Sequence, residues 1–198
     1  MSEFLTSDLH FNHKNILTYM PERAKLGATI AEMNAGLIER WNAEVSQQDT
    51  VYLLGDIAFS GITKTKELVS HLNGKIVLVK GNHDTSIKDY KWLDAGILEV
   101  HESLELDHYG IKLRLSHYPY APDGLSDNED SRFLNRRIEN KGIHLLHGHL
   151  HSVPQNKIRL AKNNALMYDV GVDANNYSPI LLDAVVKELL NYGKNHCT

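Results

Sequence analysis

The stretch KIVLVKGNHD, residues 75–84, runs from a short apolar segment directly into a polar turn. The apolar part has the length and residue types of a buried β-strand, and the Gly-Asn pair ends it. The turn places Asn82, His83 and Asp84 immediately behind the strand. This combination predicts a strand whose carboxyl end carries reactive side chains, and it recurs elsewhere in the chain.

Similar junctions between a strand and a polar turn occur at four other places. The strand at 3–8 ends in TSD, the strand at 50–56 ends in LLGD, and later strands contain LRLSH and LLHGHLH. Between strands, the segment 29–45 has apolar residues at helical spacing, and Thr29 with Glu32 forms a capping-box pattern. Strands that alternate with helices indicate an α/β fold, with either one mixed sheet or two sheets packed together.

The remaining elements are expected from capping and turn signals. We expect helices over 63–74 with Asn73-Gly74 as the stop, over 131–142, and over 178–193 with Ser178 as N-cap, Pro179 at the first position and Gly193 as the stop. We expect a hairpin within 97–119 that turns near Tyr109-Gly110, a surface loop over 119–130, a strand in 143–151, and two strands in 157–172 that join near Asn163-Asn164. No internal repeat or linker interrupts the chain, so residues 1–198 are expected to form one domain.

The composition argues against several classes of protein. The chain has 198 residues, of which 42% are hydrophobic and 23% charged, as in ordinary globular proteins. A net charge of −4 gives no basic surface of the kind that long nucleic acids require. Cys197 is the single cysteine, which excludes a disulfide framework and a cysteine-based zinc site. Because no leader pattern and no membrane-spanning apolar run occur, a reducing cytoplasm is the expected location.

The ends of the expected strands carry side chains that bind metals. They are Asp8, His10, Asp56, Asn82, His83, Asp84, His117, His149 and His151. In open α/β sheets the carboxyl ends of strands form the ligand crevice, so these side chains are expected to converge. Two of the sets contain residues two apart, which in a strand point to the same side. One such residue alone is more often a turn or packing residue, but five strand ends together indicate a metal site.

The ligand types narrow the choice of metal. Mixed oxygen and imidazole donors without thiolate suit Mn²⁺, Fe²⁺, Ni²⁺, Co²⁺ or Zn²⁺, whereas Ca²⁺ and Mg²⁺ prefer more oxygen ligands. Seven candidate ligands exceed the needs of one tetrahedral ion and fit two ions that share a carboxylate. Two ions about 3.5–4 Å apart can clamp a phosphate and activate a water molecule.

Five short motifs follow one another along most of the chain. They are DLH at 8–10, GD at 55–56, GNHD at 81–84, SH at 116–117 and GHLH at 148–151. In this order they resemble the motifs of the calcineurin-like metallophosphoesterases, in particular the small bacterial and phage members. Those members also have stretches similar to SDLHFNHKNI at 7–16 and VGVDANNYSPI at 170–180. The resemblance implies a four-layer α/β/β/α sandwich, in which two mixed β-sheets are flanked by helices.

The resemblance also implies a role for each motif residue. The first metal would be held by Asp8, His10 and His151, the second by Asn82, His117 and His149, and Asp56 would bridge them. His83 would act on the substrate, as general acid toward the leaving oxygen or as a stabiliser of phosphoryl charge. Asp84 would orient the His83 ring and favour its protonated form. Mn²⁺ is the favoured ion, and a metal-activated hydroxide would be the nucleophile.

The expected activity is hydrolysis of a small phosphate mono- or diester, such as a nucleotide or a cyclic nucleotide. A nuclease or an RNA-end phosphatase could use the same site; the basic segment 132–141 favours this alternative and the acidic net charge opposes it. A non-catalytic metal-binding scaffold would be marked by loss of a ligand or of the acid histidine, and none is lost. The sequence does not determine the physiological substrate or the oligomeric state.

Several residues near the motifs have two interpretations. Lys14, Arg132 and Arg136 could contact substrate phosphate, or could be exposed charges on a loop or a helix face. Asn12 occupies a position where similar sequences often have Gly, which affects the loop after the first motif. His147 precedes the Gly of the last motif and is expected to be a neighbour of the site rather than a ligand.

Overall fold

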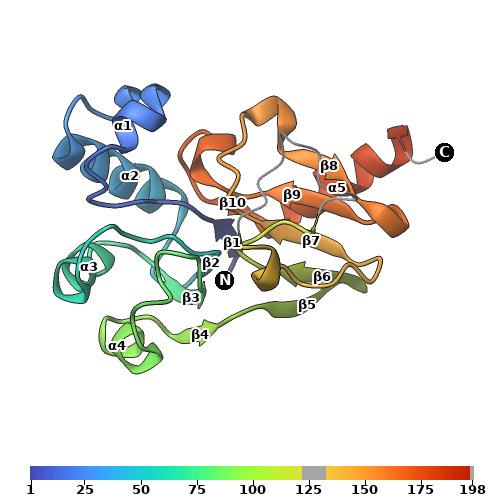
Figure 1. Cartoon of the computed structure of the whole chain (residues 1–198), viewed down its shortest axis with the longest axis horizontal. Helices are drawn as coiled ribbons and strands as arrows, with labels where there is room; N and C mark the ends of the chain where they lie inside the picture. Colours follow the sequence, from blue (N-terminus) through green and yellow to red (C-terminus); the bar gives the residue numbers. More distant parts are fainter. Residues whose placement is uncertain (122–132, 197–198) are drawn as a thin grey trace.

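The computed structural model describes residues 1–121 and 133–196, which form two five-stranded sheets flanked by helices (Figure 1). The first sheet has the order β10-β1-β2-β3-β4: Ile180–Leu181, Glu3–Thr6, Thr50–Leu53, Lys75–Val79 and Glu99–His101. The second sheet has the order β5-β6-β7-β9-β8: Leu104–His108, Ile111–Leu115, His144–His147, Leu166–Asp169 and Ile158–Leu160. The prediction of two mixed sheets flanked by helices is confirmed.

The helices come mainly from the first half of the chain. They are α1 (Ile16–Tyr19), α2 (Ile30–Glu44), α3 (Ile62–Val69), α4 (Asp89–Asp94) and α5 (Leu182–His196). The predicted capping box of α2 is present: Thr29 Oγ1 accepts from the N–H of Glu32, and the Glu32 carboxylate accepts from the N–H of Thr29. Among the described helices, none is long and apolar enough to cross a membrane.

Parallel pairing brings the carboxyl ends of the strands together. In the first sheet β1, β2, β3 and β4 are parallel, and β10 pairs antiparallel with β1 at the edge. In the second sheet β6, β7 and β9 are parallel, with β5 and β8 antiparallel at the two edges. Each sheet therefore presents a row of strand ends on which one site can be built.

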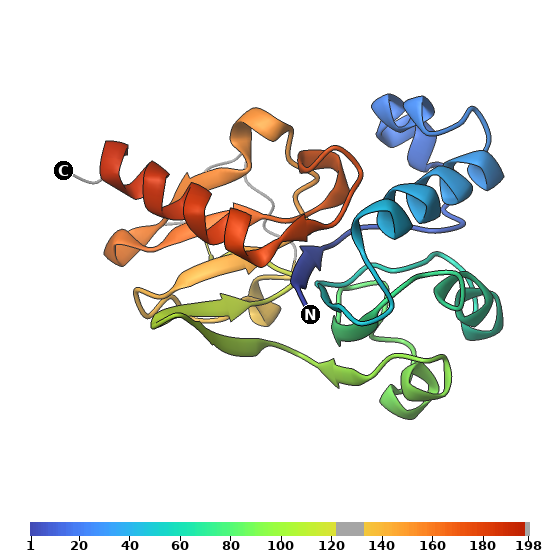
Figure 2. The ribbon, with the colours of Figure 1, turned by 180° about the vertical axis from the view of Figure 1, so that it is seen from behind.

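The side chains of β2 show how both faces of the first sheet are covered. Val51 and Leu53 face the helices, in a core with Trp41 of α2 and Trp92 of α4. Tyr52 belongs to a second core, shared with the strands of the second sheet and with α5. Helix α5, seen in front in Figure 2, packs against β1 and β9. Because both faces are buried, the strand is a continuous apolar run.

The hairpin predicted within 97–119 is present as β5 and β6. Tyr109 and Gly110 join the two strands and have φ of 52° and 82°, as a two-residue turn of type I′ requires. The first part of the segment 97–119 is not part of the hairpin. Its strand β4, Glu99–His101, pairs in parallel with β3 of the first sheet. The join predicted near Asn163-Asn164 is confirmed between β8 and β9.

Helix α3 is shorter than predicted and ends at Val69 instead of at Asn73-Gly74. Asn73 is held by the end of α2: its N–H donates to Asn42 Oδ1, and its Nδ2 donates to the carbonyl of Val45. These bonds compete with continuation of the helix, because they tie the backbone N–H and the side chain of Asn73 to α2 and its C-cap.

The last helix begins later than predicted. Ile180 and Leu181 form β10 on the edge of β1, so α5 starts at Leu182 and Ser178 is not its N-cap. The helix also continues through Gly193 to His196, so Gly193 is not the stop. Pairing with an exposed strand edge therefore outweighs the local capping signal.

The helix predicted over 131–142 is absent from the described part, 133–142, which contains only a 3₁₀ turn at Leu134–Arg136. Ile138 packs on the second sheet, and Arg114 of β6 donates to the carbonyl of Glu139. These contacts hold the segment against the sheet. Arg132, Cys197 and most of the expected loop at 119–130 lie outside the described residues.

Candidate metal centre

The predicted ligands follow the carboxyl ends of strands in both sheets. Asp8 and His10 follow β1, Asp56 follows β2, Asn82 follows β3, His117 follows β6, and His149 and His151 follow β7. Three groups of ligand atoms each lie within 4.8 Å of one another: Asp8 with His10 and His151, His10 with Asp56 and His83, and Asp8 with Asp56 and His117. Side chains more than 140 residues apart in sequence thus meet at one place.

The turns behind the strands direct these side chains. The strands end at Thr6 and His147, so the pairs of ligands two residues apart lie in loops. Left-handed φ values of 47° to 71° occur at Asp8, His10, Asp56, His149 and His151. For residues other than Gly this conformation costs about 1–3 kcal/mol each and gathers at functional sites. The prediction that alternation along a strand orients the pairs is therefore wrong.

One carboxylate oxygen lies at the centre of the cluster. Asp56 Oδ2 is 3.6 Å from His10 Nε2, 3.6 Å from His117 Nε2 and 3.8 Å from His83 Nε2. Burial, together with the neighbouring carboxylate of Asp8, raises the pKa of Asp56 well above its usual range. A carboxylate disfavoured by burial and like charge is one that a cation stabilises.

The tautomer of His117 leaves a lone pair for a cation. Its Nδ1 lies 2.7 Å from the carbonyl oxygen of Leu54, which can only accept, so Nδ1 carries the proton. Nε2 then has a free lone pair and faces Asn82 Oδ1, another acceptor, at 3.2 Å. Two acceptors turned toward one another fit joint ligation of a metal ion.

Asp8 and His10 supply unsatisfied buried atoms at the same place. Asp8 Oδ2 accepts from the N–H of His149 at 2.9 Å, whereas Asp8 Oδ1 has no hydrogen-bond partner among the described residues. Both ring nitrogens of His10 likewise have no hydrogen-bond partner in that part of the chain. Buried polar atoms are nearly always satisfied, so these unpaired acceptor atoms fit a bound cation. The donor set therefore fits divalent ions bound by nitrogen and oxygen.

His149 lies beside the three groups of ligand atoms and is not a member of any of them. Its ring centroid is 5.1 Å from that of His117, and the ring of Tyr118 packs against both imidazoles. His147 is fully buried, and its Nδ1 lies 2.8 Å from the carbonyl oxygen of Gly148, which makes it a neighbour of the site. A Cβ on Gly148 would collide with Asp8 Oδ2, so the close approach requires Gly.

Asp84 has other partners than the sequence suggests. Its Oδ2 accepts from the N–H groups of Asp56 and Gly81 at 2.7 and 2.8 Å, and its Oδ1 accepts from the N–H of Ile57 at 3.2 Å. None of the hydrogen bonds described for this carboxylate joins it to the ring of His83. Asp84 thus stabilises the turn that carries Asp56 through hydrogen bonds to the backbone. The described hydrogen bonds do not support the expectation that Asp84 orients the His83 ring.

His83 stands at the exposed edge of the cluster, where its side chain is 36% exposed. Its N–H donates to Asp56 Oδ1 at 3.0 Å, which fixes the residue beside the ligands. Partial burial and the nearby imidazoles of His117 and His13 lower the pKa of His83 to about 4. A bound phosphate beside the ring would raise the pKa of His83 again.

Two residues absent from the motifs fix the positions of candidate ligands of the first metal. Arg23 is fully buried and donates to both carboxylate oxygens of Asp173 at 2.8 and 2.7 Å. It also donates to the carbonyls of Leu9 and Asp8, which fixes the turn behind β1. Asp173 Oδ2 lies 2.7 Å from His151 Nδ1, so His151 Nε2 points toward Asp8. Carboxylate–histidine pairs of this kind orient metal-binding histidines.

The sequence gives little signal for either residue. Asp173 lies within VGVDANNYSPI, one of the stretches that carry the family resemblance, and this is the one hint available. Arg23 lies in an ordinary polar segment, PERAK, and has no motif. Only the fold, which brings positions 150 residues apart into contact, shows the pair.

The remaining basic and polar residues that the sequence suggested near the substrate lie in different places. Lys14 lines a pocket beside the centre, Arg136 is exposed, and Arg132 lies outside the described residues. Asn12 has a φ of 61°, a conformation that Gly adopts freely and that Asn tolerates better than most residues. The departure from Gly at this position is therefore compatible with the same turn.

Comparison with known proteins decides the family. The model of the calcineurin-like phosphoesterases matches residues 4–194. The chain belongs to this family. This phosphoesterase is 32% identical over 193 residues to the uncharacterized protein MJ1445 of Methanocaldococcus jannaschii, covering 96% of this chain and 92% of that protein. It is 30% identical over 167 residues to the Gene 66 protein of Mycobacterium phage L5, covering 75% and 77% of the two chains.

The fold of the phosphoesterase also occurs among solved structures. The structure of AQ665 from Aquifex aeolicus, a protein of unknown function, aligns with a TM-score of 0.67 at 24% identity, covering 94% of this chain and 98% of that one. The family gives the reaction class, so the phosphoesterase is a hydrolase that acts on phosphoester bonds. Its clustered Asp and His side chains are candidate ligands for the metals on which the family depends.

Proposed function

We propose that this phosphoesterase hydrolyses small phosphate mono- or diesters of the nucleotide type with two divalent transition-metal ions, Mn²⁺ foremost. The observation that supports it most strongly is the meeting of acceptor atoms from both sheets around Asp56 Oδ2. The first ion would be held by Asp8, His10 and His151, the second by Asn82, His117 and His149, and both by Asp56. When bound, the two ions neutralise phosphate charge and supply an activated water as nucleophile.

His83 would act on the leaving oxygen. It is the exposed member of the groups around Asp56, so a substrate entering from solvent meets its ring first. The phosphate charge beside the ring favours the protonated imidazole, which can then give its proton to the departing alkoxide. The hydrogen bond from the main-chain N–H of His83 to Asp56 Oδ1 keeps the His83 ring beside the carboxylate that would bridge the metals.

Metal dependence is tested with a matched pair of chromogenic esters. The chelated and dialysed protein is supplied with Mn²⁺, Ni²⁺, Zn²⁺ or Mg²⁺ and assayed on p-nitrophenyl phosphate and on bis(p-nitrophenyl) phosphate. We expect no turnover without added metal and faster turnover with the transition metals, Mn²⁺ foremost, than with Mg²⁺, because the donors mix imidazole with oxygen. Turnover that survives exhaustive chelation would contradict the proposal.

His83→Ala separates the catalytic role of this residue from metal binding. We expect kcat to fall by about 10²- to 10⁴-fold, the usual contribution of a positioned acid, with both metals retained. Metal content is counted by atomic spectroscopy on the same sample. His101→Ala is the matched control, because His101 pairs with Glu99 on β4 outside the cluster. Loss of one metal in His83→Ala would make His83 a ligand, and unchanged kcat would remove its role.

A further inference from the structure

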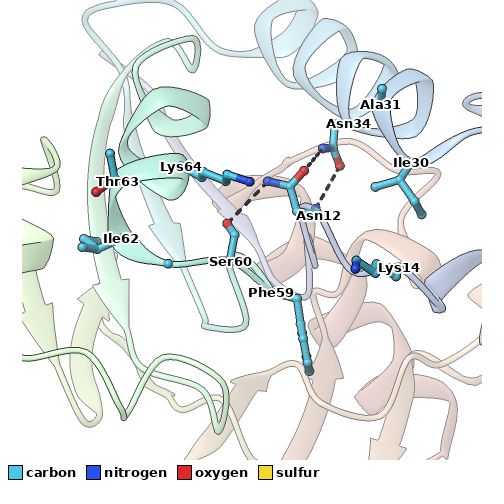
Figure 3. Close-up of a pocket in the computed structure, with 11 residues that line it drawn as sticks. Asn12, Lys14, Ile30, Ala31, Asn34, Phe59, Ser60, Ile62, Thr63 and Lys64 are labelled. Atoms are coloured by element: carbon cyan, nitrogen blue, oxygen red, sulfur yellow. Dashed lines mark hydrogen bonds between the residues drawn. The ribbon is translucent and has the colours of Figure 1, made fainter.

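A pocket of about 850 Å³ lies beside the metal centre and contains none of the proposed ligands. Its walls come from the loop behind β1, the loop behind β2, and the first turns of α2 and α3 (Figure 3). The residues that matter for its chemistry are Asn12, Lys14, Asn34, Phe59, Ser60 and Lys64. This volume is in the range of sites that enclose small organic ligands.

Phe59 connects this pocket with the metal centre. Its ring centroid is 4.2 Å from that of His83, and it stacks at 6.2 Å on the ring of His10. The side chain is 45% exposed, although the N–H of Phe59 is fixed by a 2.7 Å bond to the carbonyl of Phe11. A large aromatic ring that is exposed on a fixed backbone is a surface for stacking.

The charges of the pocket favour an anion. Lys14 and Lys64 reach it from different elements, and neither has an ion-pair partner among the described residues (Figure 3). None of the described residues that line the pocket carries a carboxylate. The first turn of α3, which adds its positive end, begins behind Gly61 with no side-chain cap.

An amide pair forms an uncharged polar wall between the two lysines. Asn34 is buried, and its Nδ2 donates to Asn12 Oδ1 at 2.8 Å while its Oδ1 accepts from the N–H of Asn12. Asn12 Nδ2 in turn donates to Ser60 Oγ at 3.4 Å. Because the buried amide of Asn34 fixes the half-buried amide of Asn12, the wall presents hydrogen-bonding groups in a constant position.

We propose that this pocket binds the leaving group and that this group is a nucleotide. The base stacks on Phe59, and the phosphate of the nucleotide lies between Lys14 and Lys64. The inference rests on the proposed function and narrows its substrate to a phosphodiester between two nucleotides. Water supplies a hydroxyl to phosphorus, the P–O bond to the leaving nucleotide breaks, and the second proton of the water ends on the leaving oxygen.

Binding to the metal-free protein tests the pocket without catalysis. Adenosine 3′-phosphate, adenosine 5′-phosphate and adenosine are titrated into the chelated full chain by calorimetry. We expect at least one monophosphate to bind about tenfold more tightly than adenosine, as a charge-assisted contact provides. Lys14→Ala, Lys64→Ala and Phe59→Leu should each weaken that binding about tenfold. Lys66→Ala, an exposed lysine of α3 outside the pocket, should not change it.

Equal affinity for adenosine and both monophosphates, or unchanged affinity in the three pocket variants, would overturn the inference. Melting temperatures of all variants show that each is folded.

Kinetics distinguish failure of the inference from failure of the proposed function. The metal-loaded protein is assayed on a deoxyadenosine dinucleotide phosphorylated at both ends and on bis(p-nitrophenyl) phosphate. We expect Lys64→Ala to lower kcat/KM about tenfold more on the dinucleotide than on the chromogenic diester. Equal losses on both substrates would overturn the inference and leave the proposed function intact. If wild type hydrolyses neither substrate, the proposed function fails, and the calorimetry still decides what the pocket binds.

Discussion

At the scale of single residues, Arg23 and Asp173 stabilise the turns that carry the first set of ligands. Arg23 is fully buried, and Asp173 accepts both from it and from His151. These hydrogen bonds lower the pKa of Asp173 to about 2 even though burial alone would raise it. The carboxylate is therefore charged at neutral pH, and its hydrogen bond fixes the His151 ring.

Asp173→Asn is predicted to weaken metal binding. The variant leaves the buried Arg23 charge uncompensated and removes the anion that orients His151, so we expect a 10- to 100-fold loss of affinity for Mn²⁺. The same change should lower the free energy of unfolding of the metal-free protein by about 3–5 kcal/mol. Calorimetric titration and urea unfolding measure the two effects.

Asp183→Asn is the control for this prediction, because Asp183 pairs with His108 on an exposed face of α5. It should leave the affinity for Mn²⁺ unchanged. An Asp173→Asn protein with wild-type affinity would show that His151 is oriented without the carboxylate.

At the scale of elements, a single carboxylate closes the turn between α2 and β2. Asp49 Oδ2 accepts from Ser46 Oγ and from the N–H of Ser46, and Asp49 Oδ1 accepts from the N–H of Ser2. The bond from Ser46 Oγ, with the two backbone donors, lowers the pKa of Asp49 from 3.8 to about 2. The turn thus ties the amino terminus to the start of β2.

Acid should remove the contribution of Asp49 to stability. The folded-state pKa lies below the unfolded value, so the contribution is complete above pH 4 and disappears as the pH falls through about 2. We expect Asp49→Asn to be less stable than wild type at pH 5 and the two proteins to converge near pH 2. Urea unfolding at several pH values measures this, with Asp94→Asn as an exposed control. A difference that stays constant with pH would contradict it.

At the scale of the whole molecule, the proposed metals would join the two sheets. Asp8 and Asp56 come from the first sheet, whereas His117, His149 and His151 come from the second. A ligand that binds only the folded arrangement stabilises it in proportion to the logarithm of its concentration. Metal binding and global stability are therefore coupled in this fold.

Saturation with Mn²⁺ is predicted to raise the melting temperature. At a free concentration 100 times Kd the stabilisation is about 2.7 kcal/mol, which corresponds to about 5–10 °C for a chain of this size. Scanning calorimetry of the chelated and the metal-loaded protein measures the shift. Asp56→Asn, which removes the charge of the central carboxylate, should abolish most of it. A melting temperature independent of Mn²⁺ in wild type would rule out a centre shared between the sheets.

The chemistry of the site can be predicted from the sequence because residue types are local information. Asp8, His10, Asp56 and His117 are recognisable as candidate ligands from their place behind apolar strands, whatever the later path of the chain. Local interactions also specify the capping box at Thr29, which needs only contacts within four residues. Signals of this range do not depend on packing.

Local sequence signals for helix ends give wrong boundaries where tertiary contacts override them. Ser178 has the pattern of an N-cap, but pairing of the next residues with β1 moves the start of α5. Asn73-Gly74 has the pattern of a helix stop, but contacts with α2 end α3 earlier. In each case hydrogen bonds to a distant element satisfy backbone groups that a helix would otherwise use.

The sequence by itself determined the class of fold, the order of the motifs and the donor types of the metal centre. Only the tertiary structure decided that left-handed turns direct the candidate ligands, that Arg23 and Asp173 fix the loops that carry some of them, and that Phe59 lies between this cluster and a basic pocket. The physical reason is the sequence separation over which each property is determined. Donor chemistry belongs to a single residue, whereas burial, orientation and pocket shape depend on residues that come into contact only after folding.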